Sequence, residues 1–181
     1  PFSIDAYLPS FHAIGSELGA GELAVQQTLT YYLAPFALMT LWHGALSDAF
    51  GRKRVVLIGF ALFALASLLC VLAPCIEILW LGRLLQGATA GAGIVVSRAL
   101  IRDLFEGPQA QKLMAHVAIM FALAPAIAPV VGGWLQTLLG WRAVFVFLAV
   151  FALVLLALCW WRLPETLPVG KRQPFSARYL L

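Results

Sequence analysis

Long apolar stretches, separated by short groups of charged residues, run through the whole sequence. No charged residue lies between Glu22 and Asp48, between Arg54 and Glu77, or between Lys112 and Arg142. A helix needs about 20 mostly apolar residues to cross a bilayer, and each of these stretches is long enough. They lack the alternation of β-barrel strands, and lipid cannot satisfy open backbone groups. The pattern therefore predicts membrane-spanning helices.

We expect five complete spans and the end of one more, at residues 1–11, 23–46, 55–75, 77–98, 113–138 and 142–162. The first is too short to cross a bilayer, and no initiator Met or basic leader precedes it, so we interpret it as the end of a truncated helix. Residues 1–162 are then an all-α transmembrane bundle. Residues 163–181, which are polar and basic, are predicted to begin a central cytoplasmic loop.

Composition indicates the same environment. The 181 residues are 62% hydrophobic and 11% charged, whereas a soluble domain carries about 25% charged residues. This is too little charge to cover a surface that faces water, so the lipid bilayer is the expected surrounding. The formal net charge of +4 does not indicate a nucleic-acid partner, because the basic residues lie between apolar stretches and form no stripe.

Lys and Arg gather on one side of the predicted membrane. The loops on the other side carry a single cation, Arg142. By the positive-inside rule, the cation-rich loops and the C-terminal tail are cytoplasmic. The cations on that side are Arg52, Lys53, Arg54, Arg98, Arg102, Lys112, Arg162, Lys171, Arg172 and Arg178.

No residue pattern predicts an enzyme, a metal site or a bound cofactor. Cys70, Cys75 and Cys159 lie in or beside apolar stretches without CxxC spacing, so we interpret them as small packing residues. The three histidines are far apart in the sequence and lack the spacing of metal ligands.

Arg83 lies inside the predicted span 77–98. A central Arg costs roughly 2.5–3.5 kcal/mol on insertion scales, so it should face a cavity or an acid, or else extend to water near the interface. Gln86 follows at helical spacing and shares its face. Asp5 is the other charge expected at membrane depth. We hypothesise that Arg83 faces the transport path and holds Asp5, which exchanges a proton.

Small residues and prolines mark predicted helix contacts. Gly87 and Gly91 form a GxxxG face, which lets helix backbones approach closely in lipid. Pro125 and Pro129 remove helix hydrogen bonds from the span 113–138 and bend it. Both features suit a bundle that moves, and they equally suit tight packing in any membrane bundle.

The segment Gly44-Ala-Leu-Ser-Asp48-Ala-Phe-Gly51-Arg52-Lys53-Arg54 resembles the signature of the major facilitator superfamily, G-x-L-[SA]-D-[RK]-x-G-R-[RK]. It lies between the second and third predicted spans, as in that family. Ala49 departs from the signature, because the family usually has a basic residue there. The resemblance implies a cytoplasmic gating motif whose residues are Gly44, Asp48, Gly51, Arg52 and Arg54.

Further segments resemble the Bcr/CflA-type drug/proton antiporters of this superfamily. Arg83-Leu-Leu-Gln86-Gly87 is similar to R-x-x-Q-G, and Asp5-Ala-Tyr-Leu-Pro9 is similar to D-x-Y-L-P. Residues 124–133 resemble the antiporter motif G-x-x-x-G-P-x-x-G-G, with alanines in place of two glycines. We assign to that motif Pro125, Pro129, Gly132 and Gly133.

The resemblance implies the six-helix N-terminal bundle of a twelve-helix transporter in a bacterial inner membrane, built from two inverted three-helix repeats. The C-terminal half of the same transporter is then an expected partner. Asp5 would carry the proton, Arg83 would tune it, and Thr28, Tyr32 and Gln86 would line the substrate cavity. The expected function is proton-coupled export of small drug-like compounds by alternating access.

Two other functions stay open at this point. A porter or symporter for a nutrient or metabolite would have the same signature. A non-transporting membrane receptor, or a half-transporter that acts as an interaction subunit, would have the same spans. The sequence does not name the substrate.

Overall fold

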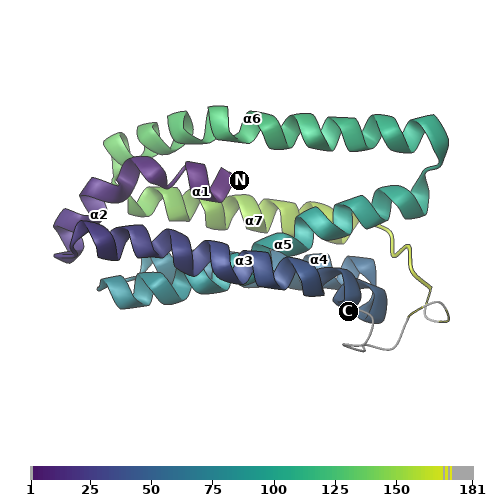
Figure 1. The fold of residues 1–181 in the computed structure, drawn as a ribbon, viewed down its shortest axis with the longest axis horizontal. Coiled ribbons are helices and arrows are strands. Elements are labelled where there is room, and N and C mark those ends of the chain that lie inside the picture. The colour runs from purple at the N-terminus through teal and green to yellow at the C-terminus, as the bar shows by residue number, and fades with distance from the viewer. Residues whose placement is uncertain (1, 169, 171, 173–181) are drawn as a thin grey trace.

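The computed structural model describes residues 2–168, 170 and 172, and it places long helices side by side in a bundle (Figure 1). Helix formation follows from the apolar stretches, because a helix satisfies all of its own backbone groups. The elements are α1 (Phe2–Asp5), the 3-10 turn η1 (Leu8–Ser10), α2 (Phe11–Leu18), α3 (Glu22–Phe50), α4 (Arg52–Val71), α5 (Ile76–Leu104), α6 (Gly107–Leu139) and α7 (Arg142–Arg162).

Four of these helices are long and apolar enough to cross a membrane, namely α4, α5, α6 and α7. They contain the spans predicted at 55–75, 77–98, 113–138 and 142–162, apart from the last residues of the first. The span predicted at 23–46 lies within α3, which is not among the four. Polar residues lower the hydropathy of α3, and several of them, Thr28, Tyr32, His43 and Ser47, are buried inside the bundle.

Several helices extend beyond the predicted membrane spans, past the charged residues that were taken as their limits. Helix α5 continues to Leu104, past the predicted end at 98, and α6 begins at Gly107 before the predicted start at 113. Helix α4 begins at Arg52 and ends at Val71, where 55–75 was expected. A charged residue ends contact with hydrocarbon, but the helical hydrogen bonds continue beyond it.

The first segment differs from the single span end predicted at 1–11. It consists of α1, η1 with Pro9 in its first turn, and α2, which continues to Leu18. Pro9 lacks a backbone N–H, which explains the interruption. Of the loop predicted at 163–181, the cations Lys171 and Arg178 lie outside the described residues.

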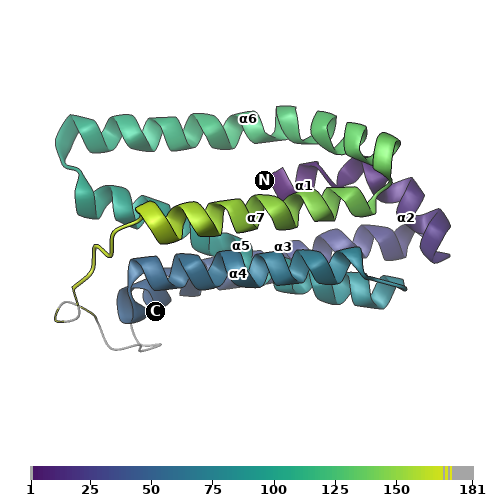
Figure 2. The same ribbon diagram turned by 180° about the vertical axis from the view of Figure 1, so that it is seen from behind.

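The bundle has two ends, which are opposite each other in Figures 1 and 2. We call one the α2 end; it carries α2, the α4–α5 turn and the α6–α7 turn. We call the other the Arg52 end; it carries the α3–α4 turn, the α5–α6 turn and the segment after α7. The main apolar core lies towards the α2 end, where Tyr7, Ile14, Leu79, Trp141 and Phe145 pack together.

Close packing joins α3 to α5 and α4 to both α5 and α7. A Cβ atom added to Gly87 would lie 2.8 Å from the carbonyl carbon of Tyr32, and one added to Gly91 would lie 2.8 Å from Oγ1 of Thr40. The close approach predicted from the GxxxG face is therefore confirmed, and its partner is α3.

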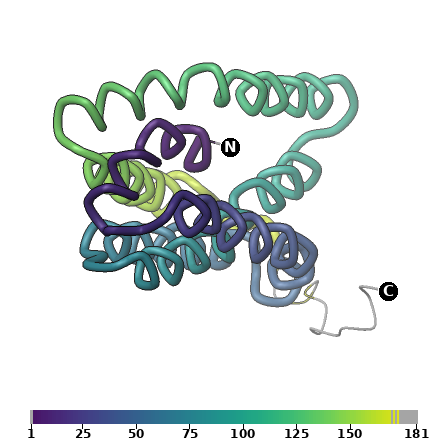
Figure 3. Tube along the Cα trace, turned by 60° about the vertical axis from the view of Figure 1, so that its left-hand side comes forward, coloured from purple at the N-terminus to yellow at the C-terminus, as the bar shows by residue number. Residues whose placement is uncertain are grey.

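Helix α6 lies along one edge of the bundle and arches away from the other helices, as the tube in Figure 3 shows. Its buried residues are Ala128 and Gly132. These two lie against the first segment of the chain: a Cβ atom added to Gly132 would lie 2.6 Å from the carbonyl carbon of Ala6. Helix α6 thus touches the short helix that carries Asp5.

Candidate functional site

Arg83 is completely buried between α1, α3 and α5, with 0% of its surface exposed. Its guanidinium carbon lies 4.6 Å from the ring centre of Tyr7 and 4.4 Å from that of Tyr32. Nη1 donates to the backbone oxygen of Ser3 at 3.3 Å and to Oε1 of Gln86 at 2.9 Å. The atoms Nε and Nη2 are buried and have no hydrogen-bond partner in the described part of the chain.

Hydrogen bonds around Arg83 fix the groups that touch it. Nε2 of Gln86 donates to Oγ of Ser67 at 2.7 Å, which sets the orientation of the Gln86 amide. The hydroxyl groups of Ser3 and Tyr32 lie 2.8 Å apart. We call the set of Ser3, Tyr7, Tyr32, Ser67, Arg83 and Gln86 the Arg83 cluster.

Thr28 extends the Arg83 cluster through Tyr7, since their hydroxyl groups lie 2.9 Å apart. The three residues predicted to line a cavity, Thr28, Tyr32 and Gln86, are thus brought together with Arg83. All three are buried, at 0%, 1% and 0% exposure. They form a packed polar core in this conformation.

The Arg83 cluster holds a cation without an acid. The two tyrosine faces attract the guanidinium, an interaction of about 2 kcal/mol when desolvated. A buried ion loses several kcal/mol of hydration, which two rings and two hydrogen bonds only partly offset. The Nε–Nη2 edge, which suits a bidentate carboxylate, is the unused part of this side chain.

Asp5 does not touch Arg83 in this structure. Ser3 and Tyr7 contact Arg83 and are four residues apart, so they share one face of the helical segment. Asp5 lies midway between them and therefore faces another direction. It is partly exposed, and no ion pair or hydrogen bond of its side chain occurs within the described residues. The predicted pair stays a prediction for another conformation.

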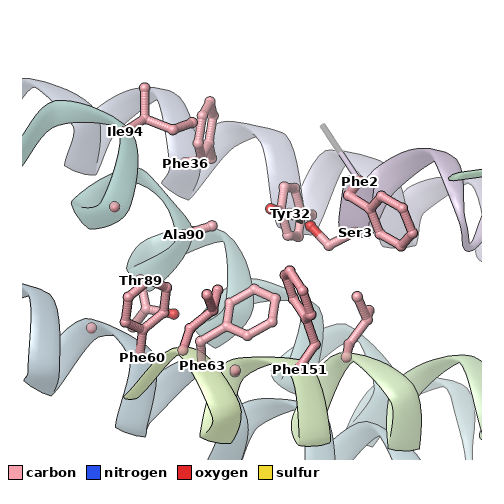
Figure 4. Close-up of a pocket in the computed structure, with 15 residues that line it drawn as sticks. Phe2, Ser3, Tyr32, Phe36, Phe60, Phe63, Thr89, Ala90, Ile94 and Phe151 are labelled. Carbon is pink, nitrogen blue, oxygen red and sulfur yellow. Dashed lines mark hydrogen bonds between the residues drawn. The ribbon is translucent and has the colours of Figure 1, made fainter. Parts of the chain in front are cut away.

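An apolar pocket of about 220 Å³ adjoins the Arg83 cluster on the side of the Arg52 end. Figure 4 shows Phe36 and Tyr32 of α3 on one side of it, with Phe60 and Phe63 of α4 opposite. Ser3 and Tyr32 belong both to this pocket and to the Arg83 cluster. Of the residues predicted to line a cavity, Tyr32 is the one that lines this pocket.

The gating motif forms an ionic cluster at the Arg52 end. The Arg52 guanidinium contacts Asp48 at 2.5 Å and Asp103 at 3.1 Å. Its backbone N–H donates to Oε1 of Glu165 at 3.0 Å, and Thr166 donates to Asp103 at 3.0 Å. We call Asp48, Arg52, Asp103 and Glu165 the Arg52 cluster. It ties the α3–α4 turn to the end of α5 and to the segment after α7.

Gly51 makes the α3–α4 turn possible. Its φ of 102° is a conformation that favours glycine, and a Cβ atom there would lie 2.5 Å from Oε2 of Glu165. Gly44 packs against Val95 at an ordinary distance, with 3.8 Å to an added Cβ. Arg54 is exposed. The structure thus brings Asp48, Gly51 and Arg52 together and leaves Arg54 outside the cluster.

The antiporter motif lies on α6, with Pro125 and Pro129 inside the helix. Gly132 packs against the backbone of Ala6, next to Asp5. Within the described residues, nothing lies within 4 Å of a Cβ atom added to Gly133. The motif therefore contacts α1 through Gly132.

The sequence model of the Major Facilitator Superfamily matches residues 1–179. The chain belongs to the major facilitator superfamily. Members of this superfamily are multi-pass membrane transporters, so the expectation that this chain is not an enzyme agrees with its family.

Three similar relatives are bacterial. The uncharacterized MFS-type transporter YdgK of Bacillus subtilis is 43% identical over 97% of this chain and 44% of its own length. A bicyclomycin resistance protein homolog of Haemophilus influenzae is 36% identical over 96% of this chain and 44% of its own length. Multidrug resistance protein D of Escherichia coli is 35% identical over 90% of this chain and 41% of its own length. The resemblance to Bcr/CflA-type exporters is confirmed, and the chain spans less than half the length of these relatives.

A solved major facilitator structure, the human organic anion transporter MFSD10 (TETRAN), superposes with a TM-score of 0.76. The superposition covers 99% of this chain and 48% of the human transporter, and the two sequences are 21% identical over it. This likeness shows the fold, and together with the family model it confirms the predicted class, an all-α helical bundle of a major facilitator transporter.

Several residues of the two clusters were not anticipated from the sequence. Ser3, Tyr7 and Ser67 surround Arg83, and Asp103 and Glu165 surround Arg52. Nothing in the sequence distinguished Ser67 from other small residues of the apolar stretches.

Proposed function

We propose that the protein exports small drug-like compounds in exchange for protons, and that Asp5 and Arg83 couple the two movements. The observation that carries this proposal is the buried guanidinium of Arg83, whose Nε and Nη2 have no hydrogen-bond partner among the described residues. Asp5, also without an ion pair there, lies on α1, in the segment whose Ser3 and Tyr7 contact Arg83. Relatives named for bicyclomycin and multidrug resistance support the drug class.

The chemistry follows from these positions. When Asp5 is ionised, the unused edge of Arg83 attracts it, and α1 turns so that the two approach. When Asp5 takes up a proton this attraction ends, and α1 returns to the packing seen here. A proton taken up on one side of the membrane and released on the other then drives alternating access, with Thr28, Tyr32 and Gln86 moving with the Arg83 cluster.

The orientation proposed from the cation distribution places the Arg52 end and the C-terminal tail in the cytoplasm of a bacterium. The α2 end then faces outward. The Arg52 cluster is the cytoplasmic gate, and the antiporter motif on α6 holds α1 through Gly132.

The test is drug transport by the full-length protein in inverted membrane vesicles with an imposed proton gradient. Asp5→Asn is expected to abolish gradient-driven transport while drug binding remains. Arg83→Lys is expected to lower transport strongly, because a lysine cannot present a two-donor edge. Matched controls are Glu22→Gln and Arg98→Lys, which replace exposed residues and should leave transport unchanged.

A proton symporter for a nutrient or metabolite predicts the opposite result in the same assay. Its substrate would cross the membrane in the same direction as the protons, whereas an exported drug would cross in the opposite direction. A non-transporting receptor would move no compound, with or without a gradient. Transport by Asp5→Asn at the wild-type rate would contradict the coupling role even if export itself is found.

A further inference from the structure

A second arginine cluster lies at the α2 end of the bundle. Nε of Arg142 donates to the backbone oxygen of Val71 and Nη2 to that of Ala73, both at 3.1 Å. Nη1 pairs with Glu17, whose other oxygen accepts from the indole N–H of Trp141 at 2.7 Å. The guanidinium also lies over the Trp141 ring, 4.2 Å from its centre. We call these five residues the Arg142 clamp.

The clamp joins three separate parts of the chain: the end of α2, the end of α4 with its turn, and the start of α7. The last carbonyl groups of a helix lack intrahelical partners. Arg142 occupies two carbonyls at the end of α4 and, with the same side chain, binds an acid from α2. The clamp therefore holds α2 against α4 and α7.

The Arg142 clamp repeats the plan of the Arg52 cluster. Each arginine is the first residue of its helix, close behind a glycine with positive φ, 102° at Gly51 and 85° at Gly140. Arg52 binds an acid at the end of α5 and joins the segment after α7. Arg142 binds an acid at the end of α2 and joins the end of α4. The second three-helix repeat thus carries the same contacts at the opposite end.

We propose that Arg142 is a positioning residue for transport, a latch at the α2 end that mirrors the gate at the Arg52 end and fixes the segment carrying Asp5. This role rests on the proposed transport function. It goes beyond the gating motif of the α3–α4 turn, because it assigns a latch to a turn outside that motif.

Aromatic contacts connect the clamp to the Arg83 cluster. The ring of Trp141 packs on Phe145 with centres 6.0 Å apart, and Phe145 packs on Tyr7 at 5.4 Å. Tyr7 in turn covers the guanidinium of Arg83. Opening the clamp therefore weakens the packing of Phe145 on Tyr7, and Tyr7 lies in the same segment as Asp5.

The experiment uses the full-length transporter in its native membrane and two readouts. The first is turnover and half-saturating substrate concentration, each normalised to the amount of protein in the membrane. The second is labelling of Cys75, which lies in the α4–α5 turn beside Ala73, by a membrane-impermeant maleimide. Cys159, near the end of α7 at the opposite, cytoplasmic end, should stay unlabelled by reagent added outside and is the control for an intact membrane.

Arg142→Gln is expected to lower turnover about tenfold at an unchanged half-saturating concentration. The change removes the ion pair with Glu17 and the two hydrogen bonds to the backbone carbonyls of Val71 and Ala73. Labelling of Cys75 is expected to rise several-fold while that of Cys159 stays constant. Arg142→Lys should restore part of the turnover. Glu17→Gln keeps the carbonyl bonds and should show a smaller effect of the same kind.

Normal turnover per molecule with unchanged Cys75 labelling would overturn the proposal. A loss of membrane protein with normal turnover per remaining molecule would also overturn it, because that result means a purely structural role. If Arg142→Gln does not accumulate, Glu17→Gln decides between these outcomes. Absence of gradient-driven transport by the wild type would refute the proposed function instead, and the labelling of Cys75 would still show whether a latch exists.

Discussion

The close approach of α5 to α3 at Gly87 also sets the position of Tyr32 against Arg83. A Cβ atom at this position would lie 2.8 Å from the carbonyl carbon of Tyr32 and 3.0 Å from its Cα. Both are backbone atoms of α3, so they cannot turn aside as a side chain would. The optimal separation of two non-bonded carbon atoms is about 3.5–4.0 Å. Gly87→Ala therefore has to push α3 and α5 apart by about 1 Å, and Tyr32 moves away from Arg83 with α3.

The magnitude follows from two opposing effects. Overpacking of a well-packed contact costs about 1–3 kcal/mol. Replacing a helical glycine by alanine returns about 1 kcal/mol. The net expectation is a loss of up to about 2 kcal/mol, which corresponds to a fall in Tm of up to several degrees for a chain of this size.

Gly93→Ala on the same helix is the matched control, because its added Cβ would lie 3.7 Å from the Phe60 ring, an ordinary contact. That variant should be neutral or slightly more stable. The assay is the Tm of the detergent-purified full-length protein, followed by loss of the monodisperse peak, together with transport in vesicles. Equal Tm values for the two variants, with normal transport by Gly87→Ala, would refute the argument from close approach.

Three further predictions address other contacts. Gly132→Ala should lower transport and Tm, because its Cβ would lie 2.6 Å from the carbonyl carbon of Ala6, whereas Gly133→Ala, with open space among the described residues, should change neither. Asp48→Ala should slow turnover in vesicles without abolishing drug binding, and Arg52→Ala should slow it further because Asp103 then also loses its partner. The hydrogen bond from Arg142, aided by that from Trp141, holds the pKa of Glu17 below its ordinary value of 4.5. A lowered carboxyl pKa stabilises the fold above that ordinary value, so the Tm difference between wild type and Glu17→Gln should be present at pH 7 and disappear as the pH falls through the lowered pKa of Glu17.

Much of the fold follows from the charge pattern, because lipid leaves the backbone few alternatives to a helix. The helix ends did not follow from it: Leu104 and Gly107 lie beyond the predicted limits, since hydrogen bonding continues past the hydrocarbon. The interruption at Pro9 was readable in principle from the missing N–H.

Part of the membership of the candidate site was predictable from the sequence, whereas most of its contacts were not. Helical spacing placed Gln86 beside Arg83, and the structure confirms that contact at 2.9 Å. The direction of Asp5 depends on how α1 docks on the bundle, which no local pattern encodes. Ser67 entered the Arg83 cluster through the packing of α4 on α5, a contact that only the folded chain specifies.

The interruption at Pro9 is what allows α1, with Asp5, to move separately from α2. Pro9 lacks the backbone N–H that would continue the helix, so α1 is not continuous with α2. It is held by Ala6 against Gly132, by Ser3 and Tyr7 against Arg83, and through α2 by the Arg142 clamp. A rotation that brings Asp5 to the unused edge of Arg83 exchanges these few contacts for one ion pair. We propose that a single proton on Asp5 shifts the balance between these two arrangements.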